Sequence, residues 1–128
     1  MTVMIVDDEP VLHELLRDIF ELNGYEVVGD AYDGEEALRI YRTLLLSYRR
    51  PDVVIMDHRM PGKDGVETAV EMLEIDRSTK ILFASADESA REKALGLGAV
   101  DFILKPFEIS DILVAVEKLE REKKNLTK

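Results

Sequence analysis

Residues able to do chemistry directly follow four short apolar runs of the sequence: Asp7 with Asp8, Asp57, Ser85 and Lys105. Taken singly, each is compatible with ordinary loop or helix-cap chemistry. If the runs are parallel strands, however, their carboxyl ends meet at one edge of a sheet, where ligands bind. Three carboxylates at that edge would repel one another and raise one another's pKa unless a positive group joined them. A divalent cation and Lys105 are the candidates for that group.

The donor set indicates which cation and which reaction such a site would suit. A few hard carboxylate oxygens, with water completing the coordination shell, fit Mg²⁺ better than Ca²⁺, and the site would accept Mn²⁺ as well. A carboxylate, a divalent ion, a hydroxyl and an ammonium fit phosphoryl transfer onto a carboxylate, because that reaction depends largely on positioning and charge neutralisation. In this hypothesis the ion and Lys105 hold the phosphoryl oxygens while Asp57 attacks.

The elements that must position these residues are strands and helices in alternation. The runs 3–6, 53–56 and 81–84 contain no polar residue, as expected of strands covered on both faces. Together with the run 102–104, they are predicted to be central strands that each end in one of the polar residues. A weaker run at 27–28 suits an edge strand.

Between these runs the apolar residues recur with the period of a helix. The helical stripes lie within residues 11–20, 37–45, 66–73, 88–97 and 109–119. Pro10 marks the opening turn of the first helix, and Asn23 with Gly24 marks its end. The segment 88–97 has few apolar residues and contains Gly96, so it is predicted to be the least firmly anchored helix. About five alternations require right-handed crossovers and a parallel sheet with helices on both faces.

Length and composition limit the classes of function. The 128 residues suit one domain, predicted to span 1–124 with a short tail at 125–128, and the charges after Leu119 favour a solvated helix end over a linker. The absence of cysteine and the presence of only two histidines exclude disulfides, thiol nucleophiles, and thiolate or histidine metal sites. A net charge of -10 disfavours nucleic acid and anionic membranes as partners. With no signal segment and no membrane-length apolar run, the chain is expected to be cytoplasmic.

The polar residues that follow the predicted strands occur in an order that closely resembles the receiver domain of two-component response regulators, and the resemblance extends over nearly the whole chain. The matching segments are Asp7-Asp8, the stretch from Asp57 to Gly65, Ser85-Ala86 and Lys105-Pro106-Phe107. The resemblance implies a flavodoxin-like α/β fold with five parallel strands in the order 2-1-3-4-5 and five flanking helices. It also implies that a histidine kinase or a phosphotransfer protein donates a phosphoryl group to Asp57.

The same resemblance implies roles for individual residues. The Mg²⁺ ligands would be Asp8, Asp57 and the main-chain carbonyl of Arg59, with Asp7 acting through water. Ser85 and Lys105 would grip the bound phosphoryl group. Phe102 matches an aromatic position whose rotation reports the phosphorylated state, but it lacks the hydroxyl that many relatives carry there. A plain core residue is therefore the alternative interpretation of Phe102.

Arg59 and Asp87 each lie two residues beyond a site residue, and they are predicted to form an ion pair across the mouth of the site. Exposed ion pairs contribute less than about 1 kcal/mol to stability. We therefore expect this pair to act on the access of water to the acyl phosphate, and so on its lifetime.

Three other sequence features have simpler interpretations. The segment 13–17 begins like a zinc-protease helix, but Arg17 replaces the second histidine, so His13 is predicted to be a helix surface residue. Pro61 and Gly62 are interpreted as turn formers, and Gly65 as a position that tolerates close approach at the start of the next helix.

The predicted output is a changed protein-binding surface formed by the helix at 88–97, the strand with Phe102 and the last helix, with homodimerisation on phosphorylation left open. In this interpretation the domain is a signalling phosphoacceptor that catalyses only its own phosphorylation and dephosphorylation. One alternative is a Mg²⁺-dependent phosphohydrolase with an aspartate nucleophile, which is disfavoured because His58 and Arg59, instead of a second acid, follow Asp57. The other alternative is an interaction module that never takes a phosphoryl group.

Overall fold

The computed structural model describes residues 1–126, in which five strands and five α-helices alternate along the chain. The strands are β1 (Thr2–Val6), β2 (Glu26–Ala31), β3 (Val53–Met56), β4 (Ile81–Ser85) and β5 (Asp101–Leu104). The helices are α1 (Pro10–Leu22), α2 (Gly34–Leu46), α3 (Gly65–Ile75), α4 (Arg91–Leu97) and α5 (Ile109–Leu126). A short 3₁₀ turn, η1 (Glu88–Ala90), leads into α4.

The five strands form one parallel sheet in the order β2-β1-β3-β4-β5, which is the predicted order. The chain passes from β1 outward to β2 and then returns to the other side of β1 as β3. Strand order therefore reverses between β1 and β3, and a crevice forms at their carboxyl ends. The edge position predicted for β2 is confirmed, but β5 is the opposite edge, so Lys105 follows an edge strand and not a central one.

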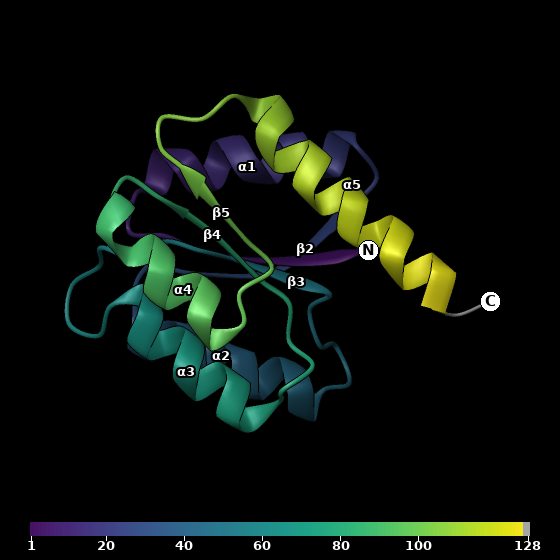
Figure 1. Ribbon diagram of the computed structural model, residues 1–128. Coiled ribbons are helices and arrows are strands. Elements are labelled where there is room, and N and C mark those ends of the chain that lie inside the picture. Colours follow the sequence, from purple (N-terminus) through teal and green to yellow (C-terminus); the bar gives the residue numbers. More distant parts are fainter. Residues whose placement is uncertain (127–128) are drawn as a thin grey trace.

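Helices cover both faces of the sheet, α1 and α5 on one side and α2, α3 and α4 on the other (Figure 1). Successive residues of a strand point to opposite faces. Thus Met4 and Val6 pack in the core under α2, α3 and α4, whereas Val3 and Ile5 pack under α1 and α5. Because β1, β3 and β4 are buried on both sides, they require unbroken apolar sequences.

The helix boundaries follow from local chemistry. Pro10 occupies the first turn of α1, as predicted. Asp64 accepts a hydrogen bond from the backbone of Glu67 and donates its own N–H to the Glu67 carboxylate, so that a capping box starts α3. The helix α4 ends at Gly98, whose φ of 111° lies in the left-handed region. Ala94 is the only fully buried residue of α4, which agrees with its predicted weak anchoring.

The surface position predicted for His13 on α1 was wrong. Its buried residues are His13, Leu16, Ile19 and Phe20, whereas Val11 is 76% exposed. His13 is therefore a core residue and not the surface residue that the sequence interpretation assigned. Its spacing of three and seven residues from Leu16 and Phe20 places it on the packed side of the helix.

The helix α5 continues to Leu126 with residues 121–125 exposed, so the charged end is a solvated helix terminus. The tail predicted at 125–128 begins within α5, which continues to Leu126, while residues 127–128 lie outside the described part. Across residues 1–126, no helix combines the length and the apolar character that crossing a bilayer requires.

Candidate functional site

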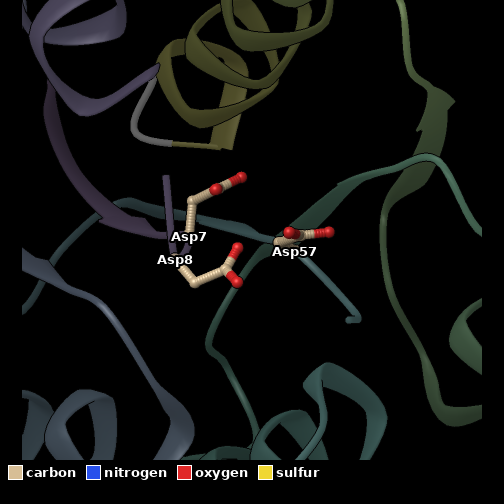
Figure 2. Close-up of side chains that lie close together, drawn as sticks. All are labelled: Asp7, Asp8 and Asp57. Atoms are coloured by element: carbon tan, nitrogen blue, oxygen red, sulfur yellow. The ribbon is translucent and has the colours of Figure 1, made fainter. Parts of the chain in front are cut away.

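Three carboxylates converge at the carboxyl edge of the sheet, where Asp7 and Asp8 follow β1 and Asp57 follows β3 (Figure 2). Each offers an oxygen atom, and these atoms all lie within 4.8 Å of one another. Asp7 and Asp57 are only 3% and 5% exposed, whereas Asp8 is open to solvent. The N–H of Asp57 donates to the carbonyl of Val6 at 2.9 Å, which fixes the two strand ends side by side.

This crowding disfavours the ionised form of Asp57. Burial raises the pKa of its carboxyl group, and the neighbouring charges of Asp7 and Asp8 raise it further. The ammonium of Lys105 and the backbone N–H of His58 act in the opposite direction, but the pKa remains above its ordinary value. Two buried carboxylates and one open carboxylate around a common point suit a hard divalent cation that keeps part of its water shell.

Lys105 reaches the cluster from the loop after β5. Its Nζ lies 2.6 Å from Asp7 Oδ2 and 3.5 Å from Asp57 Oδ2. Burial alone would lower the pKa of Lys105, but the hydrogen bond to Asp7 and the charges of both carboxylates outweigh it and raise the pKa. The ammonium therefore stays charged and is bonded to Asp7 more closely than to Asp57.

Ser85 is the last residue of β4 and is fully buried. Its hydroxyl oxygen accepts the N–H of Asp87 at 3.1 Å, and its carbonyl accepts the N–H of Lys105 at 2.9 Å. Asp87 in turn caps η1 by accepting the N–H of Ser89. Ser85 is thus linked through one residue to the start of the η1–α4 segment.

The ion pair predicted across the mouth of the site is present. Arg59 Nε donates to Asp87 Oδ2 at 2.8 Å, with the Arg59 side chain largely in solvent. His58 Nε2 lies 3.9 Å from the same oxygen. The hydroxyl of Ser89, and then Arg59, hold the pKa of Asp87 below its ordinary value. The loop after β3 is therefore joined to the loop after β4 at the rim of the acidic cluster.

Two further residues confirm or sharpen sequence expectations. A Cβ atom at Gly65 would lie 2.1 Å from the carbonyl oxygen of Asp57, so the close approach predicted there is real and excludes any larger residue. Phe102 is buried, stacks on Phe83 with ring centroids 6.2 Å apart, and carries the Arg91 guanidinium 5.0 Å above its ring. Packing and a cation–π contact, without any hydroxyl, hold it inward.

The sequence interpretation missed His13, whose Nε2 lies 2.5 Å from the main-chain carbonyl oxygen of Asp7. It also missed Tyr32, whose ring stacks on that of His13. The helical spacing of His13 from Leu16 and Phe20 was the available signal for its burial. Nothing in the sequence marks its contact with Asp7, because the contact depends on how α1 lies against β1 and β2.

Comparison with known proteins assigns this arrangement to a family. The response regulator receiver domain family matches residues 3–117. The chemotaxis protein CheY of Thermotoga maritima is 38% identical over 121 residues, which cover 93% of this chain and 97% of that protein.

Two solved structures show the same fold. In the CheX–CheY–BeF₃–Mg²⁺ complex from Borrelia burgdorferi, the matching chain has a TM-score of 0.85 and 31% identity, covering 93% of this chain and 88% of that one. The response regulator TrrA from Thermotoga maritima, in complex with Mg²⁺ and beryllium fluoride, has a TM-score of 0.78 and 32% identity, covering 92% and 97%. The match along the chain and the acidic cluster at the switch point agree, and the chain belongs to the family of response regulator receiver domains, the phosphoacceptor signalling domains of two-component systems.

Proposed function

We propose that Asp57 is the phosphoacceptor, and that the donor is a phosphohistidine of a histidine kinase or a phosphotransfer protein. The observation that carries this proposal is the position of Asp57, a buried carboxylate that shares a metal-sized space with Asp7 and Asp8 and lies 3.5 Å from the Lys105 ammonium. An Asp57 carboxylate oxygen attacks the phosphorus, the bond from phosphorus to the donor nitrogen breaks, and an aspartyl phosphate forms. The developing charge lies on the phosphoryl oxygens, where catalysis acts by neutralisation.

Magnesium is the cation that this donor set fits. Asp8, Asp57 and the main-chain carbonyl of Arg59 would hold it directly, and Asp7 through water, with Mn²⁺ able to take its place. A bound Mg²⁺ supplies positive charge to the phosphoryl oxygens. Lys105 would supply the second positive charge, and the burial of Asp57 would limit the access of water to the acyl phosphate.

Ser85 and Lys105 would convert phosphorylation into a change of shape. Charge-assisted hydrogen bonds contribute about 1.5–3 kcal/mol each, and a nearly complete switch between two states needs about 5.5 kcal/mol. Two such bonds are of the required size. Because the Ser85 hydroxyl accepts the N–H of Asp87, a movement of Ser85 towards the phosphoryl group pulls on the cap of η1 and hence on α4. Phe102, packed between β4 and Arg91 of α4, would reorient with it.

The surface that changes would be the face formed by α4, β5 and α5. Large apolar side chains are exposed along it, at Leu95, Val100, Leu104, Ile109 and Val114. We assign the downstream protein target to this face, with homodimerisation through it as the competing use. The expected place of reaction is the cytoplasm, where kinases draw phosphoryl groups from ATP.

The ion pair of Arg59 and Asp87 would control the lifetime of the aspartyl phosphate. It spans the rim between the loops after β3 and β4, where it would obstruct an attacking water. In this proposal the domain catalyses its own dephosphorylation, and the pair slows that step by restricting solvent.

Intact-mass measurement after incubation with acetyl phosphate and Mg²⁺ tests the assignment. We expect one phosphoryl adduct on the wild-type chain, and none on Asp57→Asn or when the metal is chelated. Steady turnover of acetyl phosphate without an adduct would indicate the phosphohydrolase, and no reaction would indicate the interaction module. Hydrogen exchange with and without the phosphodonor then tests the switch, which would be refuted by unchanged protection at residues 85–97.

A further inference from the structure

His13 is a buried side chain that the proposed reaction does not use. It is 2% exposed, and its Nε2 lies 2.5 Å from the main-chain oxygen of Asp7. Because a carbonyl oxygen can only accept, Nε2 carries the hydrogen of this bond. The other ring nitrogen, Nδ1, is buried without a hydrogen-bond partner and lies 3.6 Å from Asp30 Oδ2. A buried polar atom left without a hydrogen-bond partner lowers stability, and an apolar residue at this position would avoid that cost.

The bond from His13 acts on the peptide that joins the first two acids of the site. Asp7 has further hydrogen bonds that hold it in place. Its N–H donates to the Ala31 carbonyl at 3.1 Å, and its carboxylate accepts from the backbone N–H of Glu9 and from Lys105 Nζ. Asp8 is different, because its side chain makes no hydrogen bond or ion pair with any residue from 1 to 126. The direction in which the Asp8 carboxylate leaves the backbone therefore depends on the orientation of the Asp7–Asp8 peptide.

The His13 ring is itself held in a fixed orientation. It stacks on Tyr32 with ring centroids 4.2 Å apart and an interplanar angle of 26°. Tyr32 directly follows Ala31, the residue that accepts the N–H of Asp7. Asp30, whose Oδ2 lies 3.6 Å from His13 Nδ1, is in turn bound by Arg17 at 3.1 Å. The end of β2 thus orients the ring, and the ring orients the peptide.

We propose that His13 is a positioning residue of the metal site, which aims the Asp8 carboxylate at the cation by holding the carbonyl of Asp7. The inference rests on the proposed function, namely that Asp7, Asp8 and Asp57 take up Mg²⁺. The proposal explains why a histidine occupies this buried position although its Nδ1 has no hydrogen-bond partner. Groups that orient metal ligands in this way typically change metal affinity by about 10–100-fold when they are removed.

The test is Mg²⁺ affinity measured by NMR titration of backbone amides, together with thermal unfolding in the absence of metal. His13→Met removes both the donor and the unpaired nitrogen, so we expect affinity to fall about tenfold while the unfolding midpoint stays the same or rises. His13→Gln keeps an N–H donor at the end of the side chain and is expected to return affinity to within about threefold of the wild type. Tyr41→Phe, which removes a buried hydrogen bond to Thr79, is the control that lowers stability and leaves affinity unchanged.

The outcomes separate the two proposals. If the wild-type chain takes up no Mg²⁺, the proposed function fails; if it binds and His13→Met binds equally well, only the role of His13 fails. Should His13→Met not fold, Tyr32→Leu decides the question, because it removes the stacking partner and keeps every hydrogen-bonding atom of His13. We expect an affinity loss of about two- to threefold in that variant, and an unchanged affinity would overturn the inference.

Discussion

Asp52 and Asp57 lie directly before and directly after β3, and their electrostatic environments are opposite. Asp52 accepts hydrogen bonds from the N–H and hydroxyl of Thr2 and from Lys123 Nζ, at 2.7, 3.1 and 2.6 Å. Burial alone would raise its pKa, but these donors outweigh the burial and lower it. Asp57 accepts one hydrogen bond, from the backbone N–H of His58, and its pKa is raised.

The different environments of Asp52 and Asp57 distinguish the amino edge of the sheet, where polar groups stabilise the fold, from the carboxyl edge, where the candidate site lies. At the amino edge the polar groups are paired with one another, as in the bonds of Arg50 to Asp76 and Ser78. At the carboxyl edge Asp7 and Asp57 share one lysine, and the Asp8 side chain has no ion-pair partner among residues 1–126. Negative charge that the protein leaves without partners is available to a cation, and we expect it to lower stability as long as no cation is bound. Substitutions at the two edges should therefore have opposite effects.

The largest effect is expected at the amino edge. Asp52→Ala leaves the Thr2 amide and Lys123 without their acceptor and should lower the free energy of unfolding by about 2 kcal/mol at neutral pH. Since the folded-state pKa of Asp52 is lowered, its contribution is complete above the unfolded-state value near 3.8 and is lost as pH falls through the folded-state pKa. Urea denaturation of the wild type and of Asp52→Ala at a series of pH values measures this contribution. Equal stability of the two proteins at neutral pH would contradict a stabilising role for the hydrogen bonds of Asp52.

At the carboxyl edge we expect the opposite change in the free energy of unfolding. Asp57→Asn removes a buried, under-compensated charge and should raise the free energy of unfolding by about 1 kcal/mol in metal-free buffer at neutral pH. The folded-state pKa of Asp57 is raised, so the wild type gains stability as pH falls through that pKa towards 3.8, and the advantage of Asn disappears there. Thermal unfolding in a chelating buffer is the measurement. A destabilised Asp57→Asn would mean that Lys105 already compensates the cluster.

The smallest effect on stability is expected at the rim. Arg59→Ala breaks an exposed ion pair and should change the free energy of unfolding by less than about 0.5 kcal/mol. The loss of the aspartyl phosphate, followed by intact mass after removal of the donor, should nevertheless become about threefold faster, because water reaches the site more easily. Arg49→Ala, which breaks an exposed pair with Glu26 remote from the site, is the matched control and should alter neither quantity. An unchanged dephosphorylation rate in Arg59→Ala would show that the rim pair does not control water.

Much of the fold and the membership of the acidic cluster could be predicted, because each rests on a pattern that local chemistry enforces. Unbroken apolar runs require strands covered on both faces, and parallel strands bring Asp7 and Asp57 to one edge. The burial of His13 was predicted wrongly because α1 carries more apolar positions than one face can bury, and packing against β2 selects among them. The closer bond of Lys105 to Asp7 depends on a difference below 1 Å, which no sequence pattern encodes. The carbonyl of Arg59 as a ligand and the rotation of Phe102 stay predictions.

The unequal distances of the Lys105 ammonium from its two carboxylates have a thermodynamic consequence for the order of events. While it neutralises Asp7, this single cation is not fully available to an incoming phosphoryl group on Asp57. Under the proposed function, a metal ion that neutralised Asp7 would free the lysine to contact the phosphoryl group. Magnesium binding and phosphorylation would then be positively coupled, and by reciprocity the factor by which magnesium favours phosphorylation would equal the factor by which phosphorylation raises magnesium affinity.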